Sequence, residues 1–290
     1  MKHFFIFLLF ISISNWNRIA ARETVLTYNI GDFQVSILSE GGQDAGSSML
    51  AGATPEIIDK YLPEGVFRLE IQAFLVRTPD KNILIDAGTG QNLSGNLESL
   101  NIGGDMIHVI LLTHMHGDHI GGLLKDGKKA FPQAELYLSQ AEYDFWQASE
   151  RGADARKVLE AYKDRLHLFV PGELGGEISD LLPGVKPVAA YGHTPGHTAF
   201  LVESLKTQLL IWGDVTHAIP VQMPHPEISM TFDNNREQAA ATRKKILEYV
   251  QKNRIRIAGA HIVLPAIGDI RPGKAEGEYE FIPMCTCEAI

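Results

Sequence analysis

The densest group of chemically capable side chains lies between Thr113 and His119. This stretch reads Thr-His-Met-His-Gly-Asp-His. Imidazole and carboxylate groups are good ligands for zinc and similar divalent ions. His114 and His116 are two residues apart, so both can point to one side of an extended segment. Asp118 and His119 follow, which makes four potential ligands in this short loop. A single ion cannot easily bind all four. The spacing therefore predicts two adjacent metal ions.

Other metal-binding residue types follow apolar segments elsewhere in the chain. The run Val109–Leu112 precedes the first loop and predicts a buried strand. His193, Asp214 and His261 each follow another strand-like segment. Because open α/β folds place their chemistry at the ends of strands, we expect these side chains to meet at one sheet edge. The candidate metal ligands are His114, His116, Asp118, His119, His193, Asp214 and His261.

Several polar and aromatic residues near these segments have two readings each. Asp86 follows a strand-like run and either orients a metal-binding histidine or caps a turn. His197 shares a loop with His193, and we favour a structural role for it. Ser139 and Glu142 have the spacing of a capping box at the start of a helix. The aromatic residues of that helix either pack in the core or line an apolar substrate pocket; they are Tyr143, Phe145 and Trp146.

The elements that position these residues alternate between strands and helices. Val25 to Leu38 predicts an opening hairpin, and Gly41 to Gly52 predicts a loop. Thr54 is the expected N-cap of a short helix, and Asp233 that of a long one near the C-terminal end. Composition is that of an ordinary globular protein, with 45% hydrophobic and 21% charged residues among 290. This length suits one large domain or two small ones.

Net charge bears on nucleic-acid binding, and the two cysteines lie close together near the C-terminal end. The formal net charge is −9, and the absence of a basic run argues against nucleic-acid binding. Cys285 and Cys287 are separated by one residue, and we leave open whether they are free or loosely paired.

Residues 1–21 have the layout of a secretory signal peptide. Lys2 and His3 precede the apolar run Phe4–Ile11, and Ala20 and Ala21 stand near the expected cleavage site. The apolar run is too short for a comfortable membrane span. The alternative is an amphipathic or buried N-terminal segment. We predict a secreted or periplasmic protein whose domain comprises residues 22–290, without a membrane span.

The combined pattern resembles the metallo-β-lactamase superfamily. The stretch from His114 to His119 matches its His-x-His-x-Asp-His signature, and His193, Asp214 and His261 fall where its remaining ligands are expected. The resemblance extends from about Val25 to Ile270. It implies an α/β fold of the αββα type, a four-layer sandwich with the site at one edge of the sheets.

Within this superfamily, the chain looks most like N-acyl homoserine lactone lactonases and methyl parathion hydrolases. The resemblance rests on three segments: Gly192–His197, Gly213–Asp214 and Ala260–Gly268. It implies two Zn²⁺ ions, the first held by His114, His116 and His193, the second by Asp118, His119 and His261, with Asp214 as the bridge. Several lactonases of the group have a tyrosine three residues after the bridging aspartate; here that residue is His217.

The resemblance implies hydrolysis of an acyl homoserine lactone, the activity called quorum quenching. Two metal ions lower the pKa of a bridging water, so that hydroxide is available to attack the carbonyl carbon. Asp118 is expected to pass a proton to the leaving group and His217 to hold the carbonyl. The alternatives are a phosphotriesterase of the methyl parathion type or another ester or thioester hydrolase. We expect a small-molecule substrate. A homodimer is one candidate for the oligomeric state.

Two rival classes fit the sequence less well. A purely structural zinc site closes all four positions with protein ligands, whereas seven ligands for two ions leave positions open for a substrate. A di-iron oxidoreductase of the same fold usually pairs with a flavin or electron-transfer module, for which the chain has no room.

Overall fold

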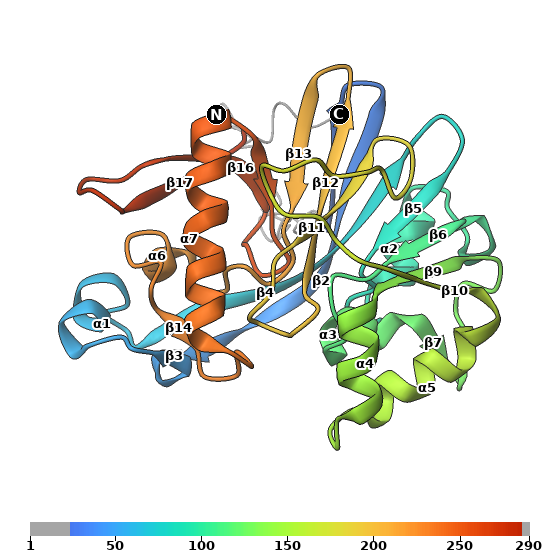
Figure 1. Ribbon diagram of the computed structural model, residues 1–290, viewed down its shortest axis with the longest axis horizontal. Helices are drawn as coiled ribbons and strands as arrows, with labels where there is room; N and C mark the ends of the chain where they lie inside the picture. Colours follow the sequence, from blue (N-terminus) through green and yellow to red (C-terminus); the bar gives the residue numbers. More distant parts are fainter. Residues whose placement is uncertain (1–23, 286–290) are drawn as a thin grey trace, which may run out of the picture.

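Two β-sheets, drawn from the two halves of the chain, form the framework of the protein. The computed structural model describes residues 24–285 (Figure 1). The first sheet has the order β1 (Val25–Ile30), β2 (Phe33–Gly46), β4 (Val66–Arg77), β5 (Asn82–Ile85), β6 (Val109–Leu111), β9 (Glu135–Ser139) and β10 (Leu166–Phe169). The second has the order β11 (Val185–Ala189), β12 (Thr198–Ser204), β13 (Thr207–Ile211), β15 (Arg256–Ala258), β16 (Ile267–Pro272) and β17 (Tyr279–Pro283).

Seven α-helices and two short strand pairs lie outside these two sheets in the described residues. The helices are α1 (Pro55–Tyr61), α2 (Leu93–Ser99), α3 (Gly117–Ile120), α4 (Gln140–Ala148), α5 (Ala153–Tyr162), α6 (Ile219–Gln222) and α7 (Arg236–Asn253). The short strand pairs are β3 (Leu50–Ala51) with β14 (Ser229–Met230), and β7 (Leu124–Lys125) with β8 (Lys128–Lys129).

Side chains alternate along the central strands between two hydrophobic cores. On β4, Phe74 and Val76 enter the core shared with the second sheet, whereas Leu75 enters the core under α2, α4 and α5. Ile246 and Val250 of α7 are buried with the second sheet. Figure 1 shows α7 on one side of the molecule and α4 with α5 on the other. The expected helix–sheet–sheet–helix sandwich is therefore confirmed.

The strands bring the candidate ligands to one edge. Strands β5, β6 and β9 are parallel, as are β13 and β15, so the segments that follow them leave the sheets in register. Backbone hydrogen bonds then join these segments. Asp86 N donates to Leu111 O at 3.0 Å, and Thr198 N donates across to Thr113 O at 2.9 Å. The ends of the two sheets are thus held together where the chemistry-bearing loops begin.

Most local predictions agree with the structure, but the loop at Gly41–Gly52 and the helix cap at Asp233 are wrong. The opening hairpin and the Thr54-capped helix are present. The predicted loop at Gly41–Gly52 is instead strand as far as Gly46, because β2 continues to pair with the long β4 across a bulge after Ser39. Asp233 is not the cap of α7. Asn235 is, and its side chain accepts a hydrogen bond from Gln238 N.

Both chain ends lie outside the described residues. The predicted signal peptide, residues 1–21, lies there and stays a prediction. Cys287 also lies outside the described residues, whereas Cys285 is described and is disulfide-bonded. Within residues 24–285, no helix combines the length and the apolar character that a membrane span requires.

Candidate metal centre

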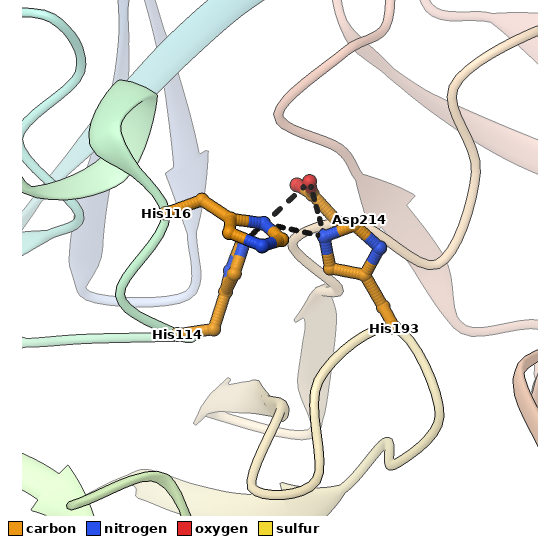
Figure 2. Close-up of side chains that lie close together, drawn as sticks. All are labelled: His114, His116, His193 and Asp214. Carbon is orange, nitrogen blue, oxygen red and sulfur yellow. Dashed lines mark hydrogen bonds and ion pairs between the residues drawn. The ribbon is translucent and has the colours of Figure 1, made fainter. Parts of the chain in front are cut away.

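Three histidine rings converge at the end of β6. The Nδ1 atom of His116 lies 2.9 Å from Nε2 of His114 and 2.9 Å from Nε2 of His193 (Figure 2). A single proton on His116 satisfies only one of these nitrogen pairs, and the other two lone pairs then face each other. A cation at the centre satisfies all three. Asp214 joins them to form a group whose ligand atoms lie within 4.8 Å of one another.

A second group lies beside the first, and Asp214 reaches both. Asp118, His119 and His261 also place their ligand atoms within 4.8 Å of one another. Oδ1 of Asp214 lies 3.1 Å from His119 Nε2, although not in hydrogen-bond geometry, and its Oδ2 lies 3.2 Å from His193 Nε2. The structure therefore brings all seven candidate ligands together in the two sets that the resemblance implies, with Asp214 between them.

Hydrogen bonds behind the cluster set the protonation of one ring in each group, His119 and His114. Asp86 Oδ2 accepts from His119 Nδ1 at 2.8 Å and from the Thr113 hydroxyl at 2.7 Å. The same hydroxyl oxygen accepts from His114 Nδ1 at 3.0 Å. Protons on both Nδ1 atoms leave the Nε2 lone pairs free for an ion. Of the two roles predicted for Asp86, the structure agrees with the orientation of a candidate metal-binding histidine.

Two further rings, those of His193 and His261, are oriented by residues from other parts of the chain. Asp233 Oδ1 accepts from His193 Nδ1 at 2.8 Å, and the backbone oxygen of Glu70 accepts from His261 Nδ1 at 2.6 Å. Asp233 also accepts from Met230 N, which fixes the carboxylate. Both histidines therefore present Nε2 to the cluster. Asp233, predicted as a helix cap, acts instead on a candidate ligand.

In the metal-free protein, the pKa values of the clustered histidines are shifted in opposite directions. Burial lowers the pKa of His114 well below its usual value and that of His116 to about 3. Burial also acts on His193, but the carboxylates of Asp214 and Asp233 raise its pKa to about 9. Asp214 is itself held well below its usual pKa, because the surrounding histidines outweigh its burial. A dense set of lone pairs around an ionised carboxylate fits divalent cations.

Glu142 joins the two ligand-bearing loops, a role that its spacing from Ser139 does not indicate. Its carboxylate is fully buried and accepts from Met115 N at 3.1 Å, Thr194 Oγ1 at 2.7 Å and Gly196 N at 3.0 Å, and also from the Trp146 indole. Ser139 caps α4 as expected, but Glu142 does not complete a capping box. Its hydrogen bonds instead fix the loop of His116 against the loop of His193.

The loop around His193 approaches α4 so closely that it needs glycine. A Cβ on Gly196 would lie 2.1 Å from Glu142 N. In the same loop, His197 Nδ1 donates to Ala190 O at 2.9 Å, and its Nε2 accepts from Asp214 N at 3.0 Å. Both nitrogens of His197 are therefore used within the protein, which agrees with the structural role predicted for it.

His217 lies against the second group. Its Nε2 is 3.1 Å from Asp214 Oδ2, and its ring stacks on His261 with centroids 4.7 Å apart. Nδ1 has no hydrogen-bond partner among the described residues. Burial lowers its pKa to about 4, so the ring is neutral. Phe232, 42% exposed and not anticipated from the sequence, places its ring 5.2 Å from that of His217.

The three aromatic residues of α4 divide between the core and the site. Trp146 meets His116 edge-on with ring centroids 5.5 Å apart. Tyr143 and Phe145 pack half-buried against the core under α4 and α5. Their predicted role as a substrate wall stays a prediction.

Comparisons with known proteins agree with this geometry. A family model described as the metallo-beta-lactamase superfamily matches residues 67–261, which is more than half of the chain. The chain belongs to the metallo-β-lactamase superfamily. As a member, it is a hydrolase of that fold with a His/Asp cluster able to bind metal.

Solved structures support the same fold over nearly the whole chain. The hydrolase AbOPH of the beta lactamase superfamily is 29% identical, with a TM-score of 0.79, over 90% of this chain and 98% of that one. AidC, a dizinc quorum-quenching lactonase solved with a product, N-hexanoyl-L-homoserine, is 23% identical, with a TM-score of 0.78, over 90% and 97%. At that identity, AidC shows the fold alone.

A curated relative covers a smaller part. The uncharacterised protein YobT of Bacillus subtilis (strain 168) is 32% identical over 149 residues, which are 50% of this chain and 61% of YobT. The match thus spans less than two thirds of that relative.

Proposed function

We propose that this superfamily member is a dinuclear zinc hydrolase that opens the lactone ring of N-acyl homoserine lactones. The observation that carries the proposal is Asp214, whose carboxylate contacts both ligand groups. Its Oδ1 lies 3.1 Å from His119 Nε2, and its Oδ2 lies 3.2 Å from His193 Nε2 and 3.0 Å from His261 Nε2. His114, His116 and His193 would hold one ion, Asp118, His119 and His261 the other. When bound, such an ion pair activates water near neutral pH and polarises an acyl oxygen. The resemblance to lactonases supports a lactone as the acyl donor.

Asp118 is the candidate proton carrier because it is the accessible carboxylate of the cluster. Its side chain is 32% exposed, whereas that of Asp214 is 3% exposed. Burial acts against ionisation, but His119 and His261 keep the pKa of Asp118 below its usual value. Ring opening adds the oxygen of water to the acyl carbon and breaks the ester C–O bond. Asp118 is placed to accept the proton of water and return it to the alkoxide that leaves.

A substrate panel tests the assignment. Zinc-loaded protein is assayed with an acyl homoserine lactone, a phosphotriester of the paraoxon type, a thioester and a β-lactam, and ring opening is followed by acid release. Asp214→Ala, which removes the shared ligand, is expected to lose both metal and turnover. Efficient phosphotriester cleavage without lactone opening would replace the lactonase assignment by the phosphotriesterase alternative. Full activity without bound metal would end both.

A further inference from the structure

A pocket of about 270 Å³ opens directly beside the cluster, at the second ligand group. His217, His261 and Arg68 are the polar residues of its lining. The remaining lining is mostly apolar and includes Leu264 and Val263, the latter 42% exposed. Apolar side chains beside a polar reactive centre are typical of a site that binds an apolar part of its substrate.

A second hollow of about 430 Å³ adjoins this pocket, between α1, α6 and the β16–β17 hairpin. The two share three lining residues: Ile219, Pro220 and Phe281. Pro220 is exposed, and the other two are half-buried. The boundary between the hollows is therefore made of surface side chains rather than of the core, and a chain lying on Phe281 contacts both.

The larger hollow, which is farther from the cluster and is called the far hollow below, is held by a backbone hydrogen bond and has equal numbers of positive and negative side chains in its lining. Tyr279 N donates to Met223 O at 2.9 Å, which ties β17 to the end of α6. Lys60 and Lys274 line the hollow together with Glu278 and Glu280, so the four charges cancel. Lysine stems commonly cover apolar groups while their ammonium groups stay in water. This lining therefore suits a neutral chain better than a charged one.

We propose that the two hollows form one acyl-chain subsite, in which the chain leaves the cluster at His217, crosses Phe281 and ends between α1 and β17. This inference rests on the proposed function, because it places the acyl group of that substrate. The acyl chain would then not run along the aromatic residues of α4. Trp146 contacts the cluster at His116, whereas the pocket borders it at His217 and His261.

The test adds bulk to the far hollow only. Ala275 is exposed and lines that hollow, so Ala275→Trp fills it without touching the cluster. Ala148, exposed at the end of α4, gives the size-matched control Ala148→Trp. We expect Ala275→Trp to lower kcat/KM for dodecanoyl homoserine lactone at least tenfold and to leave the butanoyl compound unchanged. Lost burial of roughly two methylene groups already amounts to about tenfold.

The outcomes separate this inference from the function beneath it. Equal losses for both chain lengths, or an unchanged dodecanoyl value, would overturn the subsite. Selective loss in Ala148→Trp alone would place the chain along α4. If no lactone is opened, the same variants are compared by calorimetry for binding of N-dodecanoyl-homoserine to zinc-loaded protein. Weaker binding in Ala275→Trp alone then supports the subsite although the lactonase proposal has failed, and equal binding in all three proteins removes it.

Discussion

Asp233 Oδ1 lies 2.8 Å from Nδ1 of His193, forty residues away in the chain. Asp86 has the same 2.8 Å relationship to His119, on the other side of the cluster. Each carboxylate holds the proton on Nδ1 and so frees Nε2. Because His193 belongs to one ligand group and His119 to the other, the two aspartates contact ligands of different candidate ions directly.

Asp233→Asn and Asp86→Asn are therefore expected to weaken different ions. An amide that donates to Nδ1 moves the ring proton to Nε2, the atom that would bind metal. Loss of such an outer partner typically costs about 10- to 100-fold in metal affinity. Zinc content measured over a series of chelator concentrations should fall from two ions to one in each variant. In the double variant both ions should be lost. Two ions of unchanged affinity in each single variant would contradict the arrangement.

Zinc binding should release protons, and more so in the wild type than in Asp233→Asn. The pKa of His193 is raised to about 9 in the metal-free protein, so this ring is protonated at pH 7.5 and must become neutral to bind metal. Its contribution to the stability of the metal-free fold is complete below about pH 6.5 and is lost as pH rises through 9. Zinc affinity should rise over that same interval.

Calorimetric zinc titrations in two buffers of different ionisation enthalpy measure this release. About one proton per chain is expected from His193 in the wild type, and less in Asp233→Asn, where one of the two carboxylates that raise its pKa is gone. Proton release that is the same in both proteins would show that Asp233 does not control His193.

Glu142→Gln tests whether the buried carboxylate positions the ligand loops. Either orientation of the amide leaves two of the four donors facing an NH₂ group, and an unsatisfied buried donor costs about 1–3 kcal/mol of unfolding free energy. We expect weaker zinc binding, by about tenfold, together with lower thermal stability. Glu40→Gln is the matched control. Glu40 is also buried, and its carboxylate accepts from Thr89 and Asn92, which are not in the ligand loops.

The two variants should differ in metal binding rather than in stability. A fall in melting temperature of similar size in both, with zinc affinity reduced only in Glu142→Gln, supports the positioning role. Reduced zinc affinity in both variants would mean that general destabilisation, and not the contact between the loops, explains the effect.

The metal ligands could be predicted because their signal is local: histidine or aspartate directly after an apolar strand. The residues that orient them could not. Glu142 contacts backbone atoms 27 and 54 residues away, and no spacing along the chain reports such contacts. Asp233 stands just before a helix, where a cap is the common reading, and only the fold brings it to His193. The extension of β2 likewise depends on pairing with the long β4.

Export is a separate prediction from the first 21 residues. A charged start, the apolar run Phe4–Ile11 and Ala20–Ala21 predict cleavage. N-terminal sequencing of protein from its native host should then begin near Arg22. Cytosolic protein that still begins at Met1 would exclude secretion.

The last prediction concerns His217, whose two nitrogens face different tasks. Nε2 lies 3.1 Å from Asp214 Oδ2, and Nδ1 has no partner within the described chain, so Nδ1 is the atom left for a ligand. The ring lines the pocket beside the cluster. If Nε2–H donates to Asp214, Nδ1 is an acceptor; the predicted role of holding a carbonyl requires the proton on Nδ1 instead.

Two amide substitutions separate these tasks. Asparagine places its amide near the position of Nδ1, and glutamine reaches the position of Nε2. We expect His217→Gln to keep two zinc ions but to lower kcat for lactone opening about 10²-fold, the scale of a lost carbonyl donor. His217→Asn should retain more activity, and His217→Ala should be as slow as His217→Gln with full metal content. Loss of one ion in His217→Ala would instead make His217 a metal ligand, consistent with its grouping with Asp214 and His261. Unchanged lactone kinetics in all three variants would remove any role of His217 in turnover.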